Sequence, residues 1–231
     1  MVASNATMQG QGRVISNFAL THFNAAVHFA NKVSEIEGAN RSGPFGNYFE
    51  EVSIYCSSCI ISAAASMEAL INELYLAPGP LNESFDNFDE FFWGCEKNET
   101  FMFFFRKKKK LHGFERKPAL EKYRKALSQL GKQPLRKNEE LYKLAGTLIG
   151  YRNYLIHFKP LWDEERRNES LEESLRGRFQ TAPNVDNGAN FLAMQCMSAG
   201  CANWAVSTAR NFILDFGQRS DLFPKKFGAF Q

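Results

Sequence analysis

Hydrophobic residues recur at helical spacing along most of this chain. Residues three or four apart share one face of an α-helix, because each residue turns the helix by about 100°. This spacing predicts helices over residues 14–37, 48–77, 118–130, 138–158 and 190–216. A phenylalanine-rich segment, 82–105, and a charged segment, 163–178, also show helical patterns. No segment alternates between apolar and polar residues for long enough to require a strand, so we predict an all-α fold.

Glycine and proline mark the ends of the predicted helices. Gly38 follows the first helix, the sequence PGP follows the second, Gly131 follows the third and Pro160 follows the fourth, as expected from residues that stop helices. We find neither an internal repeat nor a low-complexity linker. We therefore expect one domain over residues 13–231, preceded by a flexible tail of residues 1–12, with segment 163–178 as the part that leaves the main bundle.

Composition is typical of a soluble globular protein. The chain has 231 residues, of which 44% are hydrophobic and 23% charged, and its net charge of +3 permits nucleic-acid binding without arguing for it. The N-terminal residues lack the basic and apolar regions of a secretory signal. The most apolar stretch, residues 55–71, contains four serines and Glu68, which suits a buried helix better than a membrane span. We expect a cytoplasmic protein without membrane contact.

Five cysteines are present, and Cys56 and Cys59 form a C-x-x-C pair. A second pair at the spacing of a zinc ribbon is absent from the sequence. We interpret these two residues, together with Cys196 and Cys201, as small buried hydrophobic residues, the alternative being a metal or redox site. No cofactor and no metal is predicted.

One predicted helix has an arginine in its apolar face. In GYRNYLIHFKP, residues 150–160, the stripe that includes Leu148, Tyr151 and Leu155 would also contain Arg152 near its middle. A guanidinium needs a partner there, because burying an unpaired charge is costly. Arg152 should therefore pair with an acid in the interior, face a second protein surface or bind an anionic ligand.

Two further polar residues follow on the same helix. Asn153 and His157 are four residues apart and are neighbours on one face. Arg152 and His157 are five apart and would point about 140° from each other on an ideal helix. A long arginine side chain, and a helix that loosens before Pro160, would be needed to bring them to one cleft.

The sequence RNYLIH, residues 152–157, resembles the R-x4-6-H signature of the HEPN superfamily (higher eukaryotes and prokaryotes nucleotide-binding domain). Upstream, AAASMEALINEL, residues 63–74, is similar to the first long core helix of many members, in which a glutamate and an asparagine interrupt small and apolar positions. The resemblance covers about residues 48–160. It implies a HEPN-like helical bundle, here with additional C-terminal helices, that pairs as a symmetric homodimer with the two motifs facing each other across a cleft.

Active members of this superfamily are metal-independent endoribonucleases, often toxins or phage-defence proteins, and others are catalytically inactive binding or scaffold modules. The resemblance thus implies RNA as the substrate and a possible antitoxin protein as a partner. A subgroup that undergoes nucleotidyl modification has a tyrosine two residues after the histidine, whereas this chain has Lys159. An unrelated helical bundle is the third alternative.

The chemistry of RNA cleavage suits the catalytic residues that we predict, Arg152, Asn153 and His157. Histidine titrates near neutral pH and can remove the ribose 2′-proton or protonate the leaving 5′-oxygen. Arginine offers a permanently charged fork for phosphate oxygens. A two-fold dimer would supply two histidines, one as base and one as acid. We expect Asn153 to orient the imidazole or the phosphate.

Structural roles are the alternative for the same residues. Arg152 could pair only with Glu68 or another acid of the bundle, and His157 could serve only at the helix end, where a cation is favoured. Glu68 and Asn72, four residues apart, are interpreted as a structural polar pair instead of catalytic groups.

Positive charge is concentrated just before the third predicted helix. Such a run is usually a solvated loop, but beside a nuclease site it would attract RNA phosphates. The adjacent FMFFF, residues 101–105, could stack on bases, although core packing is the simpler interpretation. The predicted RNA-binding residues are Arg106, Lys107, Lys108, Lys109, Lys110 and Lys159.

Overall fold

The computed structural model describes residues 18–40, 46, 48–76, 117–159, 168–221 and 230 of the chain. These residues form helices, turns and loops and contain no strand, which confirms the all-α fold. The N-terminal tail and the phenylalanine-rich segment 82–105 lie outside the described residues. The helices are α1 (Ala19–Ala39), α2 (Phe49–Leu76), α5 (Ala119–Gln129), α6 (Glu140–Ile156), α7 (Glu169–Leu175) and α8 (Ala199–Ser220), with a π-helical turn at Phe191–Gln195.

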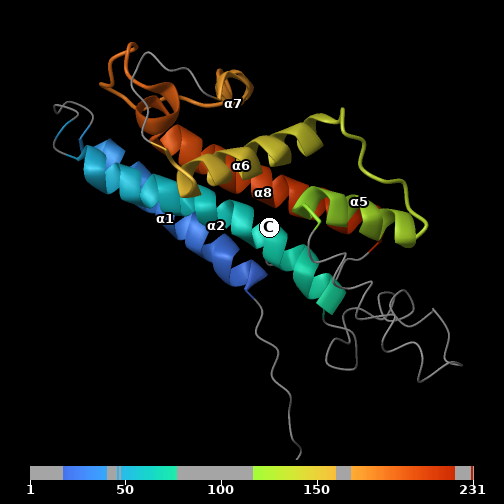
Figure 1. Cartoon of the computed structure of the whole chain (residues 1–231). Helices are drawn as coiled ribbons and strands as arrows, with labels where there is room; N and C mark the ends of the chain where they lie inside the picture. The colour runs from blue at the N-terminus through green and yellow to red at the C-terminus, as the bar shows by residue number, and fades with distance from the viewer. Residues whose placement is uncertain are drawn as a thin grey trace, which may run out of the picture.

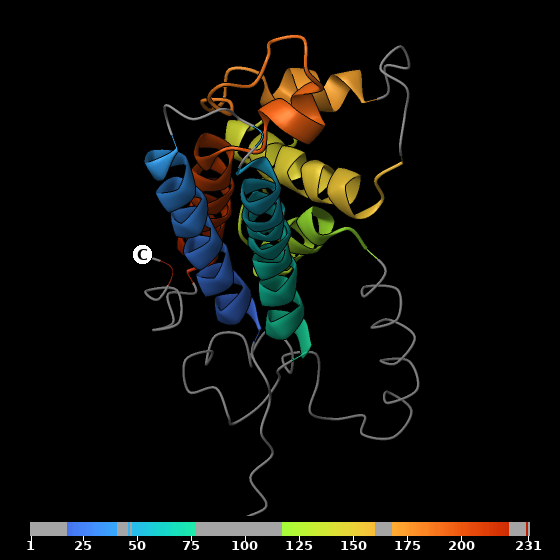
Figure 2. The ribbon, with the colours of Figure 1, turned by 90° about the vertical axis from the view of Figure 1, so that its left-hand side faces the viewer.

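The long helices pack as a bundle around α2. Helices α1 and α2 run side by side in opposite directions, and α8 packs against both (Figures 1 and 2). Helices α5 and α6 contact α2 as well as α8. The short α7 and the π-helical turn lie near the end of the bundle where α2 begins (Figure 1). Helices α2 and α8 therefore each contact all of the other long helices.

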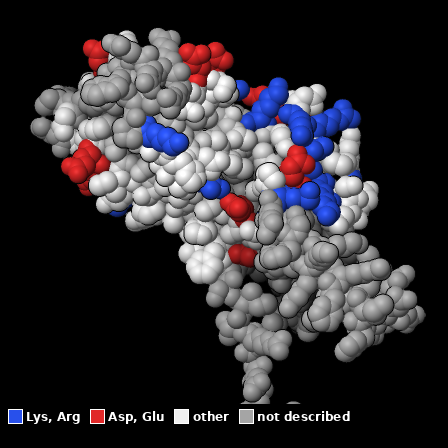
Figure 3. All heavy atoms as spheres, viewed as in Figure 1, with Lys and Arg blue, Asp and Glu red and all other residues white. Residues whose placement is uncertain are grey.

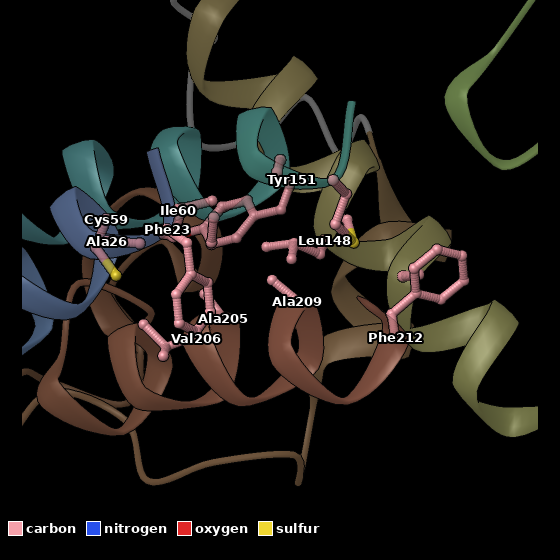
Figure 4. Packing of buried hydrophobic residues seen from close by; sticks show 14 of the residues in the cluster. Phe23, Ala26, Cys59, Ile60, Leu148, Tyr151, Ala205, Val206, Ala209 and Phe212 are labelled. Carbon is pink, nitrogen blue, oxygen red and sulfur yellow. The ribbon is translucent and has the colours of Figure 1, made fainter. Parts of the chain in front are cut away.

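Interdigitated apolar side chains fill the space between these helices. Figure 4 shows Phe23 of α1, Ile60 of α2, Leu148 and Tyr151 of α6 and Phe212 of α8 within one cluster, and all of them are buried. Complete burial of a large apolar side chain contributes about 1.5–3 kcal/mol. The core is thus assembled from residues that are distant in the sequence.

Tyrosines extend the core while their hydroxyl groups stay paired. The ring of Tyr123 lies edge-on to Phe212 and Phe216, at centroid distances of 4.9 and 4.8 Å. Its hydroxyl donates to the carbonyl oxygen of Met67 at 2.7 Å. Burial raises the pKa of Tyr123 well above its ordinary value, so the hydroxyl remains a donor.

Two long-range carboxylate contacts connect helix N-termini to other helices. Glu73 of α2 accepts hydrogen bonds from the backbone N–H groups of Phe18 and Ala19, at 2.7 and 2.9 Å, where α1 begins. Glu37 of α1 accepts from the N–H of Ala199 at 2.8 Å, where α8 begins. Carboxylates satisfy unpaired N–H groups and favour the positive end of the helix dipole. These contacts set how α1, α2 and α8 align along their axes.

The prediction of one continuous helix over residues 190–216 is wrong. The chain forms the π-helical turn, leaves helical geometry near residue 197 and begins α8 at Ala199. Ser198 causes the restart, because its hydroxyl accepts from the N–H of Cys201 at 3.0 Å and donates to the carbonyl of Gln180 at 2.9 Å. The other predicted helices agree with the structure to within a few residues wherever they are described.

Helix α2 is long and apolar enough to span a membrane, with a mean hydropathy of 1.5 over Phe49–Leu74. Half of that stretch is buried inside the bundle, and the core helix of a soluble protein has the same composition. One face of the helix is buried as expected, while the absence of membrane contact and the cytoplasmic localisation stay predictions.

Gly200 provides a test of the packing at the start of α8. A Cβ at this position would lie 2.3 Å from the carbonyl oxygen of Gln180. We predict that Gly200→Ala lowers the free energy of unfolding by about 1–3 kcal/mol, because backbone must move to relieve the overlap. Chemical denaturation measures the change.

Gly38→Ala is the matched control, because a Cβ at Gly38 would meet nothing within 4 Å. This variant should leave the stability unchanged or raise it by up to about 1 kcal/mol through helix propensity. Equal stabilities of the two variants would contradict the close approach of α8 to Gln180.

Candidate functional site

The arginine in the apolar stripe of α6 pairs with an acid of α2. Nη2 of Arg152 donates to Oε2 of Glu68 at 2.8 Å, and their side chains are 22% and 43% exposed. Nε of Arg152 is buried and has no hydrogen-bond partner among the residues that the structure describes. Of the three partners that the sequence allowed for Arg152, the structure shows an acid of the bundle, although Glu68 is partly exposed.

Asn72 pairs with a different cation. Its Oδ1 accepts from Nζ of Lys122 at 2.7 Å, and Lys122 of α5 is only 2% exposed. Glu68 and Asn72 thus lie one turn apart on α2 and each binds a cation of another helix, instead of forming a pair with each other. This arrangement assigns both residues a structural contact, between α2 and α6 and between α2 and α5.

Asn153 and His157 are exposed at the carboxyl end of α6. His157 is the C-cap residue, and its backbone N–H donates to the carbonyl of Asn153 at 2.9 Å. Arg152 faces α2, while the imidazole lies at the surface, so the structure does not bring the three predicted catalytic residues together within one chain.

Two exposed apolar residues flank His157 in the sequence. Ile156 and Phe158, on either side of His157 in the sequence, are 49% and 51% exposed. They are two of the four large hydrophobic residues that are exposed within the described ranges. The ring of Phe158 lies edge-on to Tyr154 at 5.7 Å. We call Asn153, Ile156, His157 and Phe158 the α6 end surface.

Of the predicted RNA-binding residues, the structure describes only Lys159. Residues 106–110 lie outside the described residues, and Lys159 is exposed beside the α6 end surface.

In the charged segment 163–178, α7 is formed and Arg178 makes an ion pair with Glu140 of α6. Leu171 of α7 also lies next to Gly150 of α6. The described part of this segment therefore packs against α6 and does not leave the bundle.

A basic hollow on α5 was not predicted from the sequence. Its volume is about 240 Å³, and its lining residues are Lys117, Glu121, Arg124, Lys125, Ser128 and Pro134. The residues of α5 in this lining recur at helical spacing, opposite the buried Leu120, Tyr123 and Leu127. An amphipathic helix with charged residues on its outer face is an ordinary pattern, so the sequence alone did not distinguish this surface.

No protein-family model, curated protein or solved structure matches this chain. Inference about function therefore rests on the side chains themselves.

The four described cysteines lie in the core. Cys56 and Cys59 are fully buried on α2, and their thiols donate to backbone carbonyls of residues 196, 198 and 202. Burial raises the pKa of Cys59 and Cys201, and raises that of Cys196 to about 12. Within the described ranges, no group of three or more His, Cys, Asp and Glu residues is placed to hold a metal ion.

The ion pair between Arg152 and Glu68 can be measured with a double-mutant cycle. We predict a coupling energy of about 0.5–1 kcal/mol from the stabilities of Glu68→Ala, Arg152→Ala and the double variant, because the pair is partly screened by solvent. Arg178 and Glu140 are 40% and 57% exposed and form the matched control pair, which should couple more weakly. A zero coupling energy for Arg152 and Glu68 would contradict their contact.

The buried thiols predict slow chemical modification. In a Cys95→Ser background, we expect Cys56, Cys59, Cys196 and Cys201 to react with a disulfide reagent at pH 8 only as fast as the protein unfolds, because only the exposed thiolate is nucleophilic. Guanidinium should make all four reactive at once. Rapid reaction of any of them in the native protein would contradict their burial.

Proposed function

We propose that this chain is a HEPN-type, metal-independent endoribonuclease whose site forms where two copies pair through the α6 end surface. The observation that supports this most is the exposure of His157 between two exposed apolar side chains, Ile156 and Phe158. A histidine next to exposed apolar side chains suits an interface that also performs acid–base chemistry.

Pairing about a two-fold axis would supply what one chain lacks. An isologous interface places the same patch of both copies in contact. Two α6 end surfaces would cover Ile156 and Phe158 and bring two His157 imidazoles near one another. One would take the proton of the ribose 2′-hydroxyl, and the other would protonate the leaving 5′-oxygen. The products would be a 2′,3′-cyclic phosphate and a 5′-hydroxyl end, without a metal ion.

Arg152 would act beside this pair. Its guanidinium stays charged while Glu68 holds Nη2. The Nη donors that Glu68 does not hold, and not the buried Nε, would face the negative charge that develops on the phosphate in the transition state. Glu68 is then a positioning residue, and Asn153, exposed one position later, would hydrogen-bond the phosphate or the imidazole.

A catalytically inactive HEPN-like binding module is the second candidate. The contact that favours it is the same ion pair, because a carboxylate at 2.8 Å compensates much of the charge of Arg152. Such a module would keep the pairing of two copies and the attraction for nucleic acid, but would leave RNA intact.

Replacement of His157 discriminates the two candidates. We predict that the wild-type protein cleaves RNA in excess EDTA and that His157→Ala lowers the rate by at least about 100-fold, because a proton-transfer group contributes about 10²–10⁴. Gel analysis of end-labelled RNA, with identification of cyclic phosphate ends, measures this.

His28→Ala, at an exposed histidine of α1, is the matched control and should cleave at the wild-type rate. Light scattering should show that His157→Ala and wild type have the same dimer mass. Intact RNA with wild-type protein would favour the inactive module, and equal rates for the two variants would remove His157 from the site.

A further inference from the structure

The basic hollow on α5 is lined by cationic side chains from one face of the helix and from the residue just before it. Lys117 and Lys125 are exposed, and Arg124 connects α5 to the next segment by donating through Nε to the carbonyl of Leu135 at 2.9 Å. Figure 3 shows Lys and Arg side chains gathered over the region of α5, whereas the face over α1 and α2 is largely uncharged.

The carboxylate in the hollow is already compensated. Glu121 contacts Arg124 at 3.1 Å and Lys137 at 3.3 Å. Partial burial raises the pKa of Glu121, but the hydrogen bond with Lys137 and the charges of Lys137 and Arg124 outweigh burial and lower it. The acid thus stays ionised and holds two cations in place without making the hollow neutral.

Acids near α5 are also engaged elsewhere. Glu139 pairs with Arg219 of α8, and Glu140 pairs with Arg178 beyond α7. Asp221 pairs with Lys132. These contacts hold the three carboxylates against cations that do not line the hollow.

The sequence concentrates charge in the same region. Residues 106–143 contain 14 of the 28 Lys and Arg residues of the chain but only 4 of its 25 Asp and Glu residues. The net charge of +3 therefore conceals a strongly positive region and an acidic remainder. Such asymmetry produces a long-range field that attracts polyanions.

The dimensions suit a phosphate backbone. Lys117 lies two residues before α5 and Lys125 lies within it, and eight residues of helix span about 12 Å. A strand with one phosphate per about 3.4 Å of helix axis would place three or four phosphates over that distance.

The described residues 117–143 expose no large apolar side chain, whereas surfaces that bind lipid bilayers insert such side chains.

We propose that the α5 surface, formed by Lys117, Arg124 and Lys125, binds the phosphate backbone of a nucleic acid independently of its sequence. The identification of that nucleic acid as RNA rests on the proposed function, because the bound strand would then lead to the α6 end surface for cleavage. Binding of a phosphate backbone does not depend on cleavage.

Two double variants of equal charge change test this surface. Lys117→Gln with Lys125→Gln removes two cations from the α5 surface. Lys32→Gln with Arg178→Gln removes two exposed cations elsewhere, each of which has a surface ion-pair partner. Fluorescence anisotropy with a labelled, single-stranded 2′-O-methyl RNA measures binding by the full chain, because this RNA lacks the 2′-hydroxyl needed for cleavage. Thermal denaturation checks that both variants fold.

We expect the α5 variant to bind about 25-fold more weakly than wild type at 0.1 M salt. Each phosphate contact contributes about 0.7 to the slope of log K against log salt for a single strand, so the slope should fall by about 1.4. The control variant should keep the wild-type slope. These results would support the α5 surface even if wild type failed to cleave ordinary RNA, so failure of the ribonuclease activity is distinguishable.

Equal affinities and slopes of the two variants would overturn the assignment. Binding of poly-glutamate through the α5 surface without binding of RNA would also overturn it, since an acidic protein would then be the partner. Preferential binding to vesicles of anionic lipid, lost in the α5 variant, would have the same consequence.

Discussion

The packing of α2 is the constraint on which the rest of the structure depends. Its small and apolar residues, including Ala63, Ala64 and Met67, are completely buried, and they allow α1, α6 and α8 to approach closely. Its polar residues each bind a different helix: Glu68 binds α6, Asn72 binds α5 and Glu73 binds the start of α1. Apolar burial supplies the larger share of stability, while these three contacts select the arrangement of the neighbouring helices.

This arrangement has a direct consequence for the candidate site. Because Glu68 holds Arg152 on the side of α6 that faces α2, the exposed end of the helix presents Asn153 and His157 beside Ile156 and Phe158. A single chain therefore offers an imidazole at its surface without a converging guanidinium. An acid–base pair of two His157 imidazoles would require a second copy, and in our proposal most of the attraction for a polyanion would come from α5 and the residues around it.

The helices were predictable because their apolar residues recur with period 3.6, and this holds for α6 and its stripe around Tyr151. The break before α8 was not predictable, since it depends on Ser198 reaching Gln180 in a distant loop. Arg152 was recognisable as a residue that needs a partner. Periodicity does not determine the position of α6 along the axis of α2, however, so Glu68 was only one of several possible partners. The solvent-facing residues Arg124 and Lys125 looked like the ordinary outer face of an amphipathic helix, and only the fold shows that they line a hollow together with Lys117.

Native-state hydrogen exchange measures most directly whether α2 holds the bundle together. The method gives an opening free energy for each helix under conditions in which the protein stays folded. We expect the amides between Val52 and Ile71 to exchange most slowly of all and only through global unfolding. Exchange of these amides before those of α1 or α8 would contradict the central role of α2.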